Sequence, residues 1–380
     1  MLDAELKSKV NQLWDKFWSS GISNPLTAIE QMSYLIFMKR LEDEDNENQL
    51  NAKLSGEEYI SIFSEHPDYK WSNWINMSAD EMLEHVKYKV FPFLSTIGDE
   101  KSLYNRYMKE ANFIIPTGSL LVEATSIIDD LKIKEQNKDV QGDLYEYLLS
   151  QLSTSGKNGQ FRTPRHIIKM MVEIIKPKLG EVVCDPACGT GGFLTCAIEH
   201  FENTHQINSA DDVESIQKNI QGIEKKQLPY ALCMTNLLLH GIDVPNIEHR
   251  NSLTGEVSGF GDKNQVDVII TNPPYGGIEE DGVSSNFAKE YQTKETADLF
   301  MALLMEKLSD NGRAGIVLPD SILFGDGVKN NIKRRLLKEF NLHTIVRLPE
   351  GVFAPYTSIT TNLLFFERDS KGTKEIWYYD

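Results

Sequence analysis

The C-terminal two thirds of the chain alternates between strand-like and helix-like patterns of apolar residues. Residues 266–271 form a short, apolar, β-branched run that is typical of a buried strand. Further strands are predicted at residues 312–319, 343–348, 361–367 and 376–379. A helix over residues 298–308 precedes the first of these, and the last two suggest a final antiparallel pair. The alternation predicts an α/β fold with a doubly wound, mostly parallel sheet, whose ligand lies at the carboxyl ends of the strands.

Residues 1–150 lack this alternation and consist of amphipathic stretches joined by polar connectors. Residues 4–17 place their apolar side chains on one face of a helix, and residues 25–41 form a more apolar helix. The acidic run at residues 42–48, together with residues 51–58, is expected to be a loop or a solvated helix end. The pattern therefore predicts an all-α region at the N-terminal end.

Two tryptophans and a helix-capping pattern refine this prediction. Trp71 and Trp74 come just before Ser78, and Ser78 with Glu81 matches a capping box at the start of a helix. The tryptophans are expected in the aromatic core of a helical bundle. The alternative is that aromatic side chains near the ends of the helices contact DNA.

The strand at residues 266–271 is followed by Asn272, Pro273, Pro274 and Tyr275. Neither proline has an N–H to donate, so the strand must end there and the backbone stiffens. The turn presents an amide side chain, backbone carbonyls and a flat aromatic ring. That set suits a planar ring bearing an amino group, whose hydrogen atoms the oxygens would accept. Taken alone, the motif fits a strand-ending turn with a partly buried tyrosine equally well.

A second motif, at residues 181–194, predicts a strand, a glycine-rich turn and a helix. Asp185 ends the strand, and Gly189, Gly191 and Gly192 allow positive φ and a close approach of the backbone to a ligand. No lysine follows the glycines as a phosphate-binding loop requires, and the spacing differs from that of dinucleotide-binding turns. An acid at the strand end joined to this turn is more specific than the glycines alone.

Together the two motifs resemble the S-adenosylmethionine-dependent DNA amino-methyltransferases that act on adenine N6. The resemblance covers about residues 140–380 and implies a Rossmann-like methyltransferase fold. The order, with the glycine motif first, resembles the gamma arrangement of that family. In the family the glycine turn holds the methionine part of the cofactor, and the Asn-Pro-Pro-Tyr loop holds the flipped target base.

The resemblance also implies a set of site residues. The catalytic residues it implies are Asn272, Pro273, Pro274 and Tyr275. The S-adenosylmethionine-binding residues it implies are Gln160, Phe161, Arg162, Thr163, Pro164, Arg165, Asp185, Ala187, Gly189, Thr190, Gly191, Gly192, Glu224 and Asn272. Glu224 falls one strand after the glycine motif, where an acid suits the two ribose hydroxyls of a nucleotide. An ordinary surface glutamate is the alternative for that position.

The chemistry that this resemblance implies follows from the target amine, which is a poor nucleophile because its lone pair is delocalised into the ring. Hydrogen bonds from the amine to the Asn272 side-chain oxygen and the Pro273 carbonyl would turn the lone pair toward the methyl group. Tyr275 would stack on the extruded base, which leaves the duplex at a cost of a few kcal/mol. Positioned groups of this kind contribute a few kcal/mol each to transition-state stabilisation, and alignment of the donor adds a proximity effect.

The cysteines and histidines argue by exclusion. Methyltransferases that act on cytosine C5 use a cysteine nucleophile, whereas the four cysteines here suit small buried side chains in a reducing cytoplasm. They are Cys184, Cys188, Cys196 and Cys233. None forms a paired zinc pattern, and the histidines lack a ligand spacing. No metal site is expected.

The N-terminal region resembles the helical domain of modification subunits of type I restriction-modification systems. The prediction is therefore an N-terminal helical domain over residues 1–140 and a methyltransferase catalytic domain over residues 141–380. Type I modification subunits usually carry a further C-terminal helical tail. The chain stops at Asp380 on a strand-like run, so a truncated chain or a split gene is expected.

Charge indicates how DNA would be reached. The net charge is −17, divided into −11 for residues 1–150 and −6 for residues 151–380. DNA affinity depends on Lys and Arg neutralising phosphates, so the chain alone is expected to bind DNA weakly. The candidate basic clusters are Lys333, Arg334, Arg335 and Lys338, which also fit one solvated helix face, and Arg162 with Arg165.

No insert is long enough to read a DNA sequence. Residues 276–297 look like a mobile loop that could order around DNA, but about 20 residues are too few for a reading domain. The expected partners are double-stranded DNA, a specificity subunit, a second copy of the chain and a restriction subunit. Without a signal peptide or membrane span, a cytoplasmic protein is expected. A self-contained methyltransferase acting on DNA, RNA or protein glutamine, and a non-catalytic cofactor-binding scaffold, are the alternatives.

Overall fold

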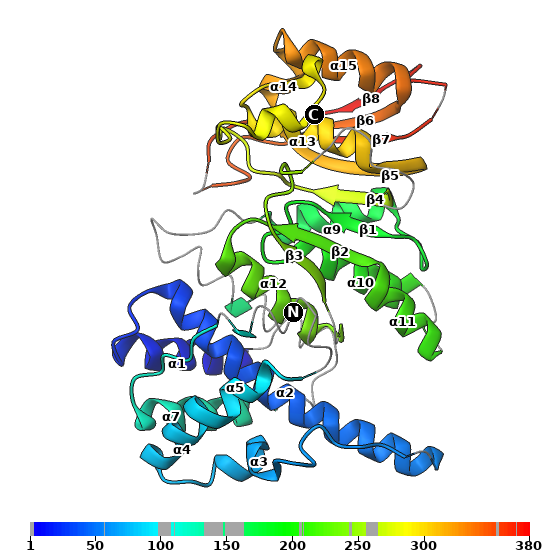
Figure 1. Ribbon diagram of the computed structural model, residues 1–380. Helices are drawn as coiled ribbons and strands as arrows, with labels where there is room; N and C mark the ends of the chain where they lie inside the picture. The colour runs from blue at the N-terminus through cyan, green and yellow to red at the C-terminus, as the bar shows by residue number, and fades with distance from the viewer. Residues whose placement is uncertain are drawn as a thin grey trace. The chain divides into compact units, whose positions relative to one another are not determined.

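The computed structural model describes residues 4–56, 58–97, 108–109, 111–132, 147–148, 163–204, 207, 209–242, 245–255, 265–354, 357–369 and 371–380. The chain divides into two compact units, one of residues 1–159 with 234–244 and one of residues 160–233 with 245–380 (Figure 1). We call them the helical unit and the α/β unit. The domain boundary predicted after residue 140 lies outside the described residues. No helix that the structure describes is long and apolar enough to cross a membrane.

Helices make up the described secondary structure of residues 4–132. The α-helices are α1 (Ala4–Ser19), α2 (Pro25–Ser55), α3 (Trp71–Trp74), α4 (Ala79–His85), α5 (Phe91–Leu94) and α7 (Gly118–Asp130). A short 3-10 helix, η1 (Pro67–Tyr69), precedes α3, and a π-helical turn, η2 (Val86–Val90), links α4 to α5. The apolar face predicted for α1 is buried, and α7 packs against α1, α2 and α4. The all-α prediction for this region is confirmed.

The acidic run after the apolar part of α2 differs from the sequence prediction. The helix continues to Ser55, and Glu42, Asp43 and Asp45 are buried in it. Asp45 accepts hydrogen bonds from the Ser61 hydroxyl at 2.8 Å and the Ile62 N–H at 3.1 Å, so the chain after α2 folds back onto the acids. The expected solvated helix end is therefore wrong for these three carboxylates.

The two tryptophans lie in the core of the helical unit. Trp71 and Trp74 are at most 1% exposed and pack edge to face with ring centroids 4.7 Å apart. Trp71 Nε1 donates to Asp129 Oδ1 at 2.8 Å. The capping box of Ser78 and Glu81 is present at the start of α4. The core prediction is confirmed for both tryptophans, and their burial excludes the DNA contact considered as the alternative.

In the part of the chain that the structure describes, one sheet of eight strands forms the centre of the α/β unit. The strands are β1 (Val183–Asp185), β2 (Ile220–Glu224), β3 (Asn246–His249), β4 (Val266–Thr271), β5 (Leu308–Pro319), β6 (Asn341–Arg347), β7 (Thr361–Glu367) and β8 (Trp377–Tyr379). The helices are α9 (Arg165–Ile175), α10 (Gly192–Thr204), α11 (Ala210–Asn219), α12 (Gln227–Leu239), α13 (Thr296–Lys307), α14 (Asp320–Phe324) and α15 (Val328–Glu339), with 3-10 turns η5 (Val283–Asn286) and η6 (Lys289–Tyr291). Residues 234–239 of α12 belong to the helical unit.

The strand order is β3-β2-β1-β4-β5-β7-β6-β8 (Figure 1). Neighbours from β3 to β5 are parallel, and β7 runs antiparallel between β5 and β6. The predicted antiparallel pairing of the last two strands is wrong, because β6 lies between β7 and β8 and pairs with β8 in parallel. The prediction of a doubly wound, mostly parallel sheet is confirmed.

Helices cover both faces of this sheet, as side-chain alternation along β5 shows. Gly315 faces α9, where an added Cβ would lie 3.3 Å from Ile175 Cγ1. Ala314, Ile316 and Leu318 point to the other face and belong to the core that includes α13 and α15. The glycine motif follows β1, and the Asn-Pro-Pro-Tyr motif follows β4. Because these two strands are adjacent and parallel, both motifs lie at the same edge of the sheet.

Candidate functional site

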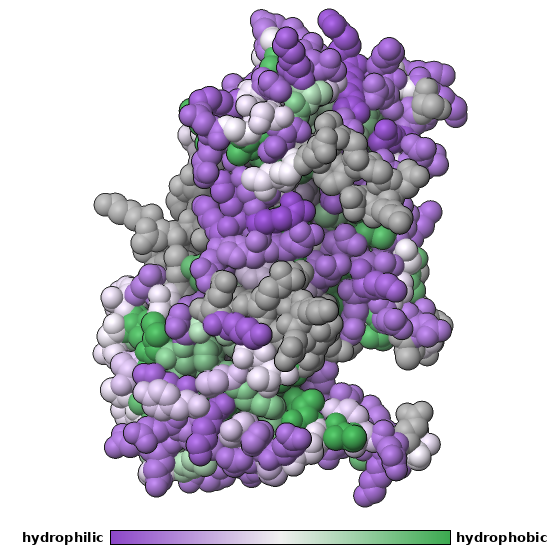
Figure 2. All heavy atoms as spheres, in the orientation of Figure 1, coloured by the Kyte–Doolittle hydropathy of each residue, from purple (hydrophilic) through white to green (hydrophobic). Residues whose placement is uncertain are grey.

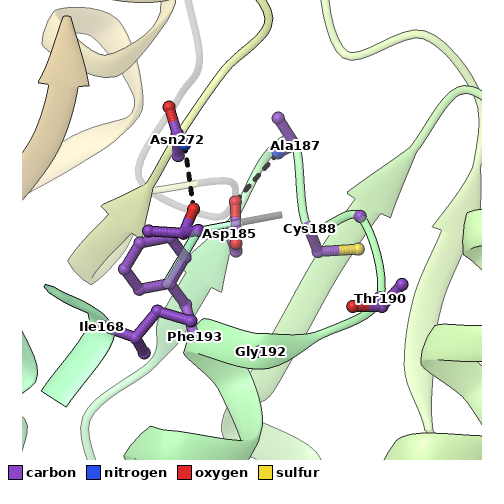
Figure 3. Close-up of a pocket in the computed structure, with 10 residues that line it drawn as sticks. Ile168, Asp185, Ala187, Cys188, Thr190, Gly192, Phe193 and Asn272 are labelled. Atoms are coloured by element: carbon purple, nitrogen blue, oxygen red, sulfur yellow. Dashed lines mark hydrogen bonds between the residues drawn. The ribbon is translucent and has the colours of Figure 1, made fainter. Parts of the chain in front are cut away.

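A pocket opens where the carboxyl ends of β1 and β4 meet the start of α10 (Figure 3). Its empty space amounts to about 410 Å³, with the open solvent at its mouth included. Its lining residues are Thr163, Ile168, Asp185, Ala187, Cys188, Gly189, Thr190, Gly192, Phe193 and Asn272. Seven of these were expected at a cofactor site from the sequence: Thr163, Asp185, Ala187, Gly189, Thr190, Gly192 and Asn272.

Asp185 is fully buried at the end of β1. Its Oδ1 accepts hydrogen bonds from Thr271 Oγ1 at 2.6 Å and from the Ala187 N–H at 3.0 Å. Its Oδ2 is buried and has no hydrogen-bond partner among the described residues. Burial raises the pKa of Asp185 to about 7, although both hydrogen bonds oppose this shift. A cationic group near Oδ2 would favour the ionised carboxylate.

The glycine turn has the conformation that its residues suggested. Gly189 and Gly191 have φ of +55° and +82°, and an added Cβ at Gly191 would lie 2.8 Å from Cys233 Sγ. The Gly189 N–H donates to Glu224 Oε2 at 3.0 Å, while Glu224 Oε1 accepts from the Lys226 N–H at 2.7 Å. Glu224 is not one of the residues that line the pocket, and it supports the turn through the hydrogen bond from Gly189. Burial raises its pKa.

Asn272 follows β4 directly, and its amide nitrogen has a hydrogen-bond partner. Its Nδ2 donates to Thr163 Oγ1 at 2.9 Å, the bond that a dashed line marks in Figure 3. Its Oδ1 is buried and has no hydrogen-bond partner among the described residues. The preceding residue, Thr271, donates to Asp185. Two consecutive residues at the end of β4 therefore bind two different lining residues of the pocket, Asp185 and Thr163. A buried acceptor without a donor is uncommon in folded proteins and calls for an explanation.

The rest of the Asn-Pro-Pro-Tyr motif forms the turn after β4. Pro273 is buried and Pro274 is exposed. Tyr275 is half-buried against the core of the sheet, and burial raises the pKa of its phenol. Its hydroxyl is therefore neutral at physiological pH and does not act as a base.

Other residues expected at the site lie beside the pocket or beyond the described residues. Gln160, Phe161 and Arg162 lie outside the described residues. Pro164 caps the N-terminus of α9, and Arg165 forms an ion pair with Glu199 on α10. Gly191 shapes the turn without lining the pocket.

Three lining residues were not predicted as site residues. Ile168 and Phe193 supply apolar surface, and Cys188 lies between them and the turn in Figure 3. Cys188 and Phe193 are part of the glycine motif, so their place in that motif could have suggested them. Ile168 comes from α9, whose approach to the pocket depends on tertiary packing. Nothing in the local pattern distinguishes it from the other apolar residues of that helix.

The cysteines are buried thiols. All four are free and buried. Burial raises the pKa of Cys184 to about 11 and that of Cys196 to about 12, which keeps both thiols protonated. Cys188 Sγ lies 3.8 Å from Cys233 Sγ beneath the turn. Within the described residues, no group of three or more His, Cys, Asp and Glu side chains is arranged to hold a metal ion.

The segment after the motif is anchored rather than loose. Glu279 accepts hydrogen bonds from Thr296 Oγ1 and Asn251 Nδ2, both at 3.1 Å, and pairs with Lys225 at 3.4 Å. Val283, Phe287 and Tyr291 bury their side chains in the core. Residues 276–297, which the sequence suggested as a mobile loop, thus have contacts with α13 and with the chain after β2 and β3.

The basic cluster on α15 is partly used within the fold. Lys333 donates to the carbonyls of Leu323 and Gly325, and Arg335 pairs with Glu306 and Glu339. Arg334 and Lys338 are exposed. Two of the four cations on α15 are thus engaged within the fold, and the face of the α/β unit in Figure 2 is mainly hydrophilic.

Two family models match the chain. The model of N-6 DNA methylases matches residues 136–380, and the model of the HsdM N-terminal domain matches residues 6–128. The first covers more than half of the chain and includes both motifs of the pocket.

Individual relatives agree with these models. The chain is 42% identical to the EcoEI methylase subunit of a type I restriction enzyme from Escherichia coli, over 95% of this chain and 74% of the relative. A crystal structure of a modification subunit attributed to a type I restriction enzyme of Vibrio vulnificus YJ016 superimposes with a TM-score of 0.88 and 36% identity, over 100% of this chain and 84% of that one. A chain from a study of complex assembly and conformational transition of the type I system gives 0.81 and 32%, over 99% and 76%.

Proposed function

The chain belongs to the N-6 DNA methylase family, as a type I methylase subunit that methylates adenine N6 in DNA, and we propose that the pocket between β1 and β4 is its active site. One observation carries the proposal. Two buried oxygens without a described hydrogen-bond partner, Asp185 Oδ2 and Asn272 Oδ1, belong to residues that line the same pocket. A cofactor with a positive charge and a substrate with an amino group would satisfy one oxygen each.

The donor of the methyl group in our proposal is S-adenosylmethionine, and the carboxylate, the glycine turn and the apolar side chains of the pocket support this choice. This cofactor supplies a methyl group on a positively charged sulfur, and its amino-acid part carries an ammonium. Asp185 would pair with positive charge, since a carboxylate accepts hydrogen bonds on both oxygens. The turn of Gly189 and Gly191 leaves room for the backbone to approach the ligand, while Ile168 and Phe193 offer apolar contacts.

Glu224 has two roles in this proposal. It holds the glycine turn through the Gly189 N–H and accepts from the Lys226 N–H, and a carboxylate with about four lone-pair sites has room for a further donor. A ribose hydroxyl can therefore donate to Glu224 without breaking the turn. Gln160, Phe161, Arg162, Pro164 and Arg165 remain proposed cofactor-pocket residues, with Arg165 acting through its pair with Glu199.

Asn272, Pro273 and Tyr275 would act on the adenine. Asn272 Oδ1 and the Pro273 carbonyl accept the two hydrogens of the exocyclic amine, which localises the lone pair on nitrogen. Tyr275 packs against the ring, and Pro274 stiffens the turn that holds all three groups. The protein needs no covalent bond to the base, in agreement with the protonated thiols of Cys184 and Cys196.

We propose that DNA reaches this site only with help from partners. The chain carries a net charge of −17, and two of the four cations on α15 are engaged within the fold. Relatives are described as subunits of type I restriction enzymes, and one structure comes from work on assembly of that system. We therefore propose a specificity subunit that reads the sequence, a second copy of this chain and a restriction subunit. Chromosomal DNA as substrate makes the cytoplasm the proposed location.

The experiment that tests this function maps N6-methyladenine across the host genome by long-read sequencing, with the gene intact and deleted. The expected result is loss of methylation at one bipartite motif with a fixed gap. Loss at a short contiguous motif would contradict the need for a specificity subunit. Unchanged methylation in a strain shown to express the protein would contradict the proposed activity.

A further inference from the structure

We propose that Thr163 is a positioning residue for Asn272: its hydroxyl accepts the amide hydrogen of Asn272 and thereby directs Oδ1 toward the substrate amine. The inference rests on the proposed function and deepens it. The resemblance placed Thr163 among residues of the cofactor pocket, whereas the hydrogen bond of 2.9 Å assigns it a partner on the base-binding motif, 109 residues further along the chain.

The position of Thr163 is set by the fold around it. It precedes Pro164, which caps α9, and α9 packs against α10, β4 and β5. The opposite end of α9 is held as well, because the Arg313 guanidinium donates to the carbonyls of Ile175 and Lys176. The Thr163 hydroxyl is therefore attached to a rigid helix that contacts the same strand, β4, from which Asn272 projects.

The direction of an asparagine amide matters because its two ends have opposite hydrogen-bonding character. The oxygen accepts, the nitrogen donates, and a rotation of 180° about the last side-chain torsion exchanges them. An amine held against the amide oxygen is activated, whereas an amine facing the amide nitrogen meets a second donor. A threonine hydroxyl can accept from Nδ2 or donate to Oδ1, and in the structure the Thr163 hydroxyl accepts from Nδ2, which leaves Oδ1 for the amine.

Two neighbouring threonine hydroxyls thus serve different partners. Thr271 donates to Asp185 on the cofactor side, and Thr163 accepts from Asn272 on the substrate side. The same chemical change, threonine to valine, removes either bond while keeping nearly the same side-chain shape. Thr163→Val tests the positioning of the Asn272 amide, and Thr271→Val tests the support of the Asp185 carboxylate.

The test uses the complex purified through a tag on the full chain, with Thr163→Val, Thr163→Ser and Thr271→Val beside the wild type. Methylation of DNA containing the genomic target is measured at saturating cofactor, and cofactor affinity is measured by calorimetry. Thr163→Val should lower kcat about tenfold, equivalent to about 1.4 kcal/mol, with the cofactor Kd changed less than threefold. Thr163→Ser should restore kcat to within about twofold of the wild type.

Thr271→Val should have the opposite pattern, with its main effect on the cofactor Kd and not on kcat. Its cofactor Kd should rise by about tenfold, since Asp185 loses a hydrogen bond that favours the carboxylate.

Base extrusion is followed separately by the fluorescence of 2-aminopurine placed at the target position. The fluorescence should increase equally with the wild type and with Thr163→Val, because base extrusion precedes the step in which the amide acts.

Several results would overturn the inference. An unchanged kcat for Thr163→Val, with or without a weaker cofactor Kd, would show that the hydroxyl does not act through Asn272. Failure of Thr163→Ser to recover activity, in a variant with wild-type thermal stability, would show that the hydroxyl at this position does not account for the activity. A wild-type complex that binds cofactor but methylates no DNA would instead overturn the proposed function itself.

Discussion

Two fully buried aspartates, one in each unit, have opposite surroundings. Asp45 in the helical unit accepts hydrogen bonds from Gln49, Tyr59, Ser61 and the Ile62 backbone. It also pairs with Lys70 at 3.4 Å. Both of its oxygens are engaged. Asp185 in the α/β unit has donors on Oδ1 alone, and its Oδ2 has no partner among the described residues.

The difference separates a structural carboxylate from one that a ligand completes. A buried polar group costs free energy unless it is hydrogen-bonded. Asp45 recovers that cost within the fold by tying the chain after α2 to the helix. Asp185 does not, and the same holds for Asn272 Oδ1 across the pocket. We infer that the folded chain tolerates these two oxygens because cofactor and substrate bind there.

The largest effect that would test this contrast is expected from Asn272→Ala. Removing the amide oxygen should lower kcat about a thousandfold, roughly 4 kcal/mol of transition-state stabilisation, because the amine loses its acceptor. Cofactor affinity should stay within about threefold of wild type, since Asp185 and the glycine turn are untouched. The measurement is kcat for target-adenine methylation together with calorimetric cofactor binding.

Asn330→Ala is the matched control for this variant. Asn330 is an exposed asparagine on α15 whose amide bonds to Asp326, so activity should remain that of the wild type. Methylation by Asn272→Ala above about one tenth of the wild-type rate would mean that the buried oxygen is not the catalytic acceptor.

Local sequence was sufficient for the parts of the site in which backbone chemistry decides the structure. The strand before Asn272 and the turn after Asp185 depend on prolines, glycines and β-branched residues, whose effects extend over a few positions. The pocket followed because adjacent parallel strands bring their carboxyl ends together.

The remaining features depend on partners that are distant in sequence or separated by a turn. The acidic run of α2 looked solvated because its hydrogen-bond donors come from residues 59–72 and appear only when the chain folds back. The pairing of β8 with β6 instead of β7 is likewise a tertiary choice. Glu224 looked like a free ligand group, although its carboxylate also receives the backbone of the glycine turn.

The structural side of the contrast is tested by Asp45→Ala. The change leaves several donors, most of them half-buried, without their acceptor, so the helical unit should lose about 3 kcal/mol of unfolding free energy. Denaturant unfolding followed by tryptophan fluorescence reports this unit, because four of the five tryptophans lie at positions 14, 18, 71 and 74. Cofactor affinity under native conditions should not change.

Glu47→Ala is the comparison within the same acidic run. Glu47 is exposed, so its removal should alter stability by less than about 0.5 kcal/mol. Equal effects of the two substitutions would mean that burial and hydrogen bonding of Asp45 do not stabilise the unit.

The ligand side of the contrast is tested by Asp185→Asn. An asparagine oxygen can still accept from Thr271 and Ala187, so the turn should be preserved. The lost negative charge should weaken binding of the cationic cofactor about 30-fold at pH 8, or roughly 2 kcal/mol. Thermal stability without cofactor should be equal to or above that of the wild type, because the variant buries no ionisable group. A lower stability with unchanged affinity would instead make Asp185 structural, like Asp45.

The smallest expected effect is a pH dependence that only Asp185 should produce. Its pKa of about 7 means that, without cofactor, the carboxyl is mostly protonated below neutral pH. Because a bound cation favours the carboxylate, binding must release that proton, and affinity should fall about tenfold between pH 8 and pH 6 while staying flat above pH 8. The ligand-free fold should become less stable as pH rises from about 4 to about 7, since the folded state keeps a proton that the unfolded chain releases.

Calorimetry in buffers of different ionisation enthalpy would count the released proton directly. The wild type should release close to one proton per cofactor at pH 6 and almost none at pH 8, whereas Asp185→Asn should release none from this position at either pH. The affinities of the two proteins should therefore converge toward pH 6. An equal proton release by Asp185→Asn would assign the titration to another group, for example Glu224, whose pKa is also raised by burial. In that case the unpartnered oxygen of Asp185 would no longer distinguish it from Asp45 in function.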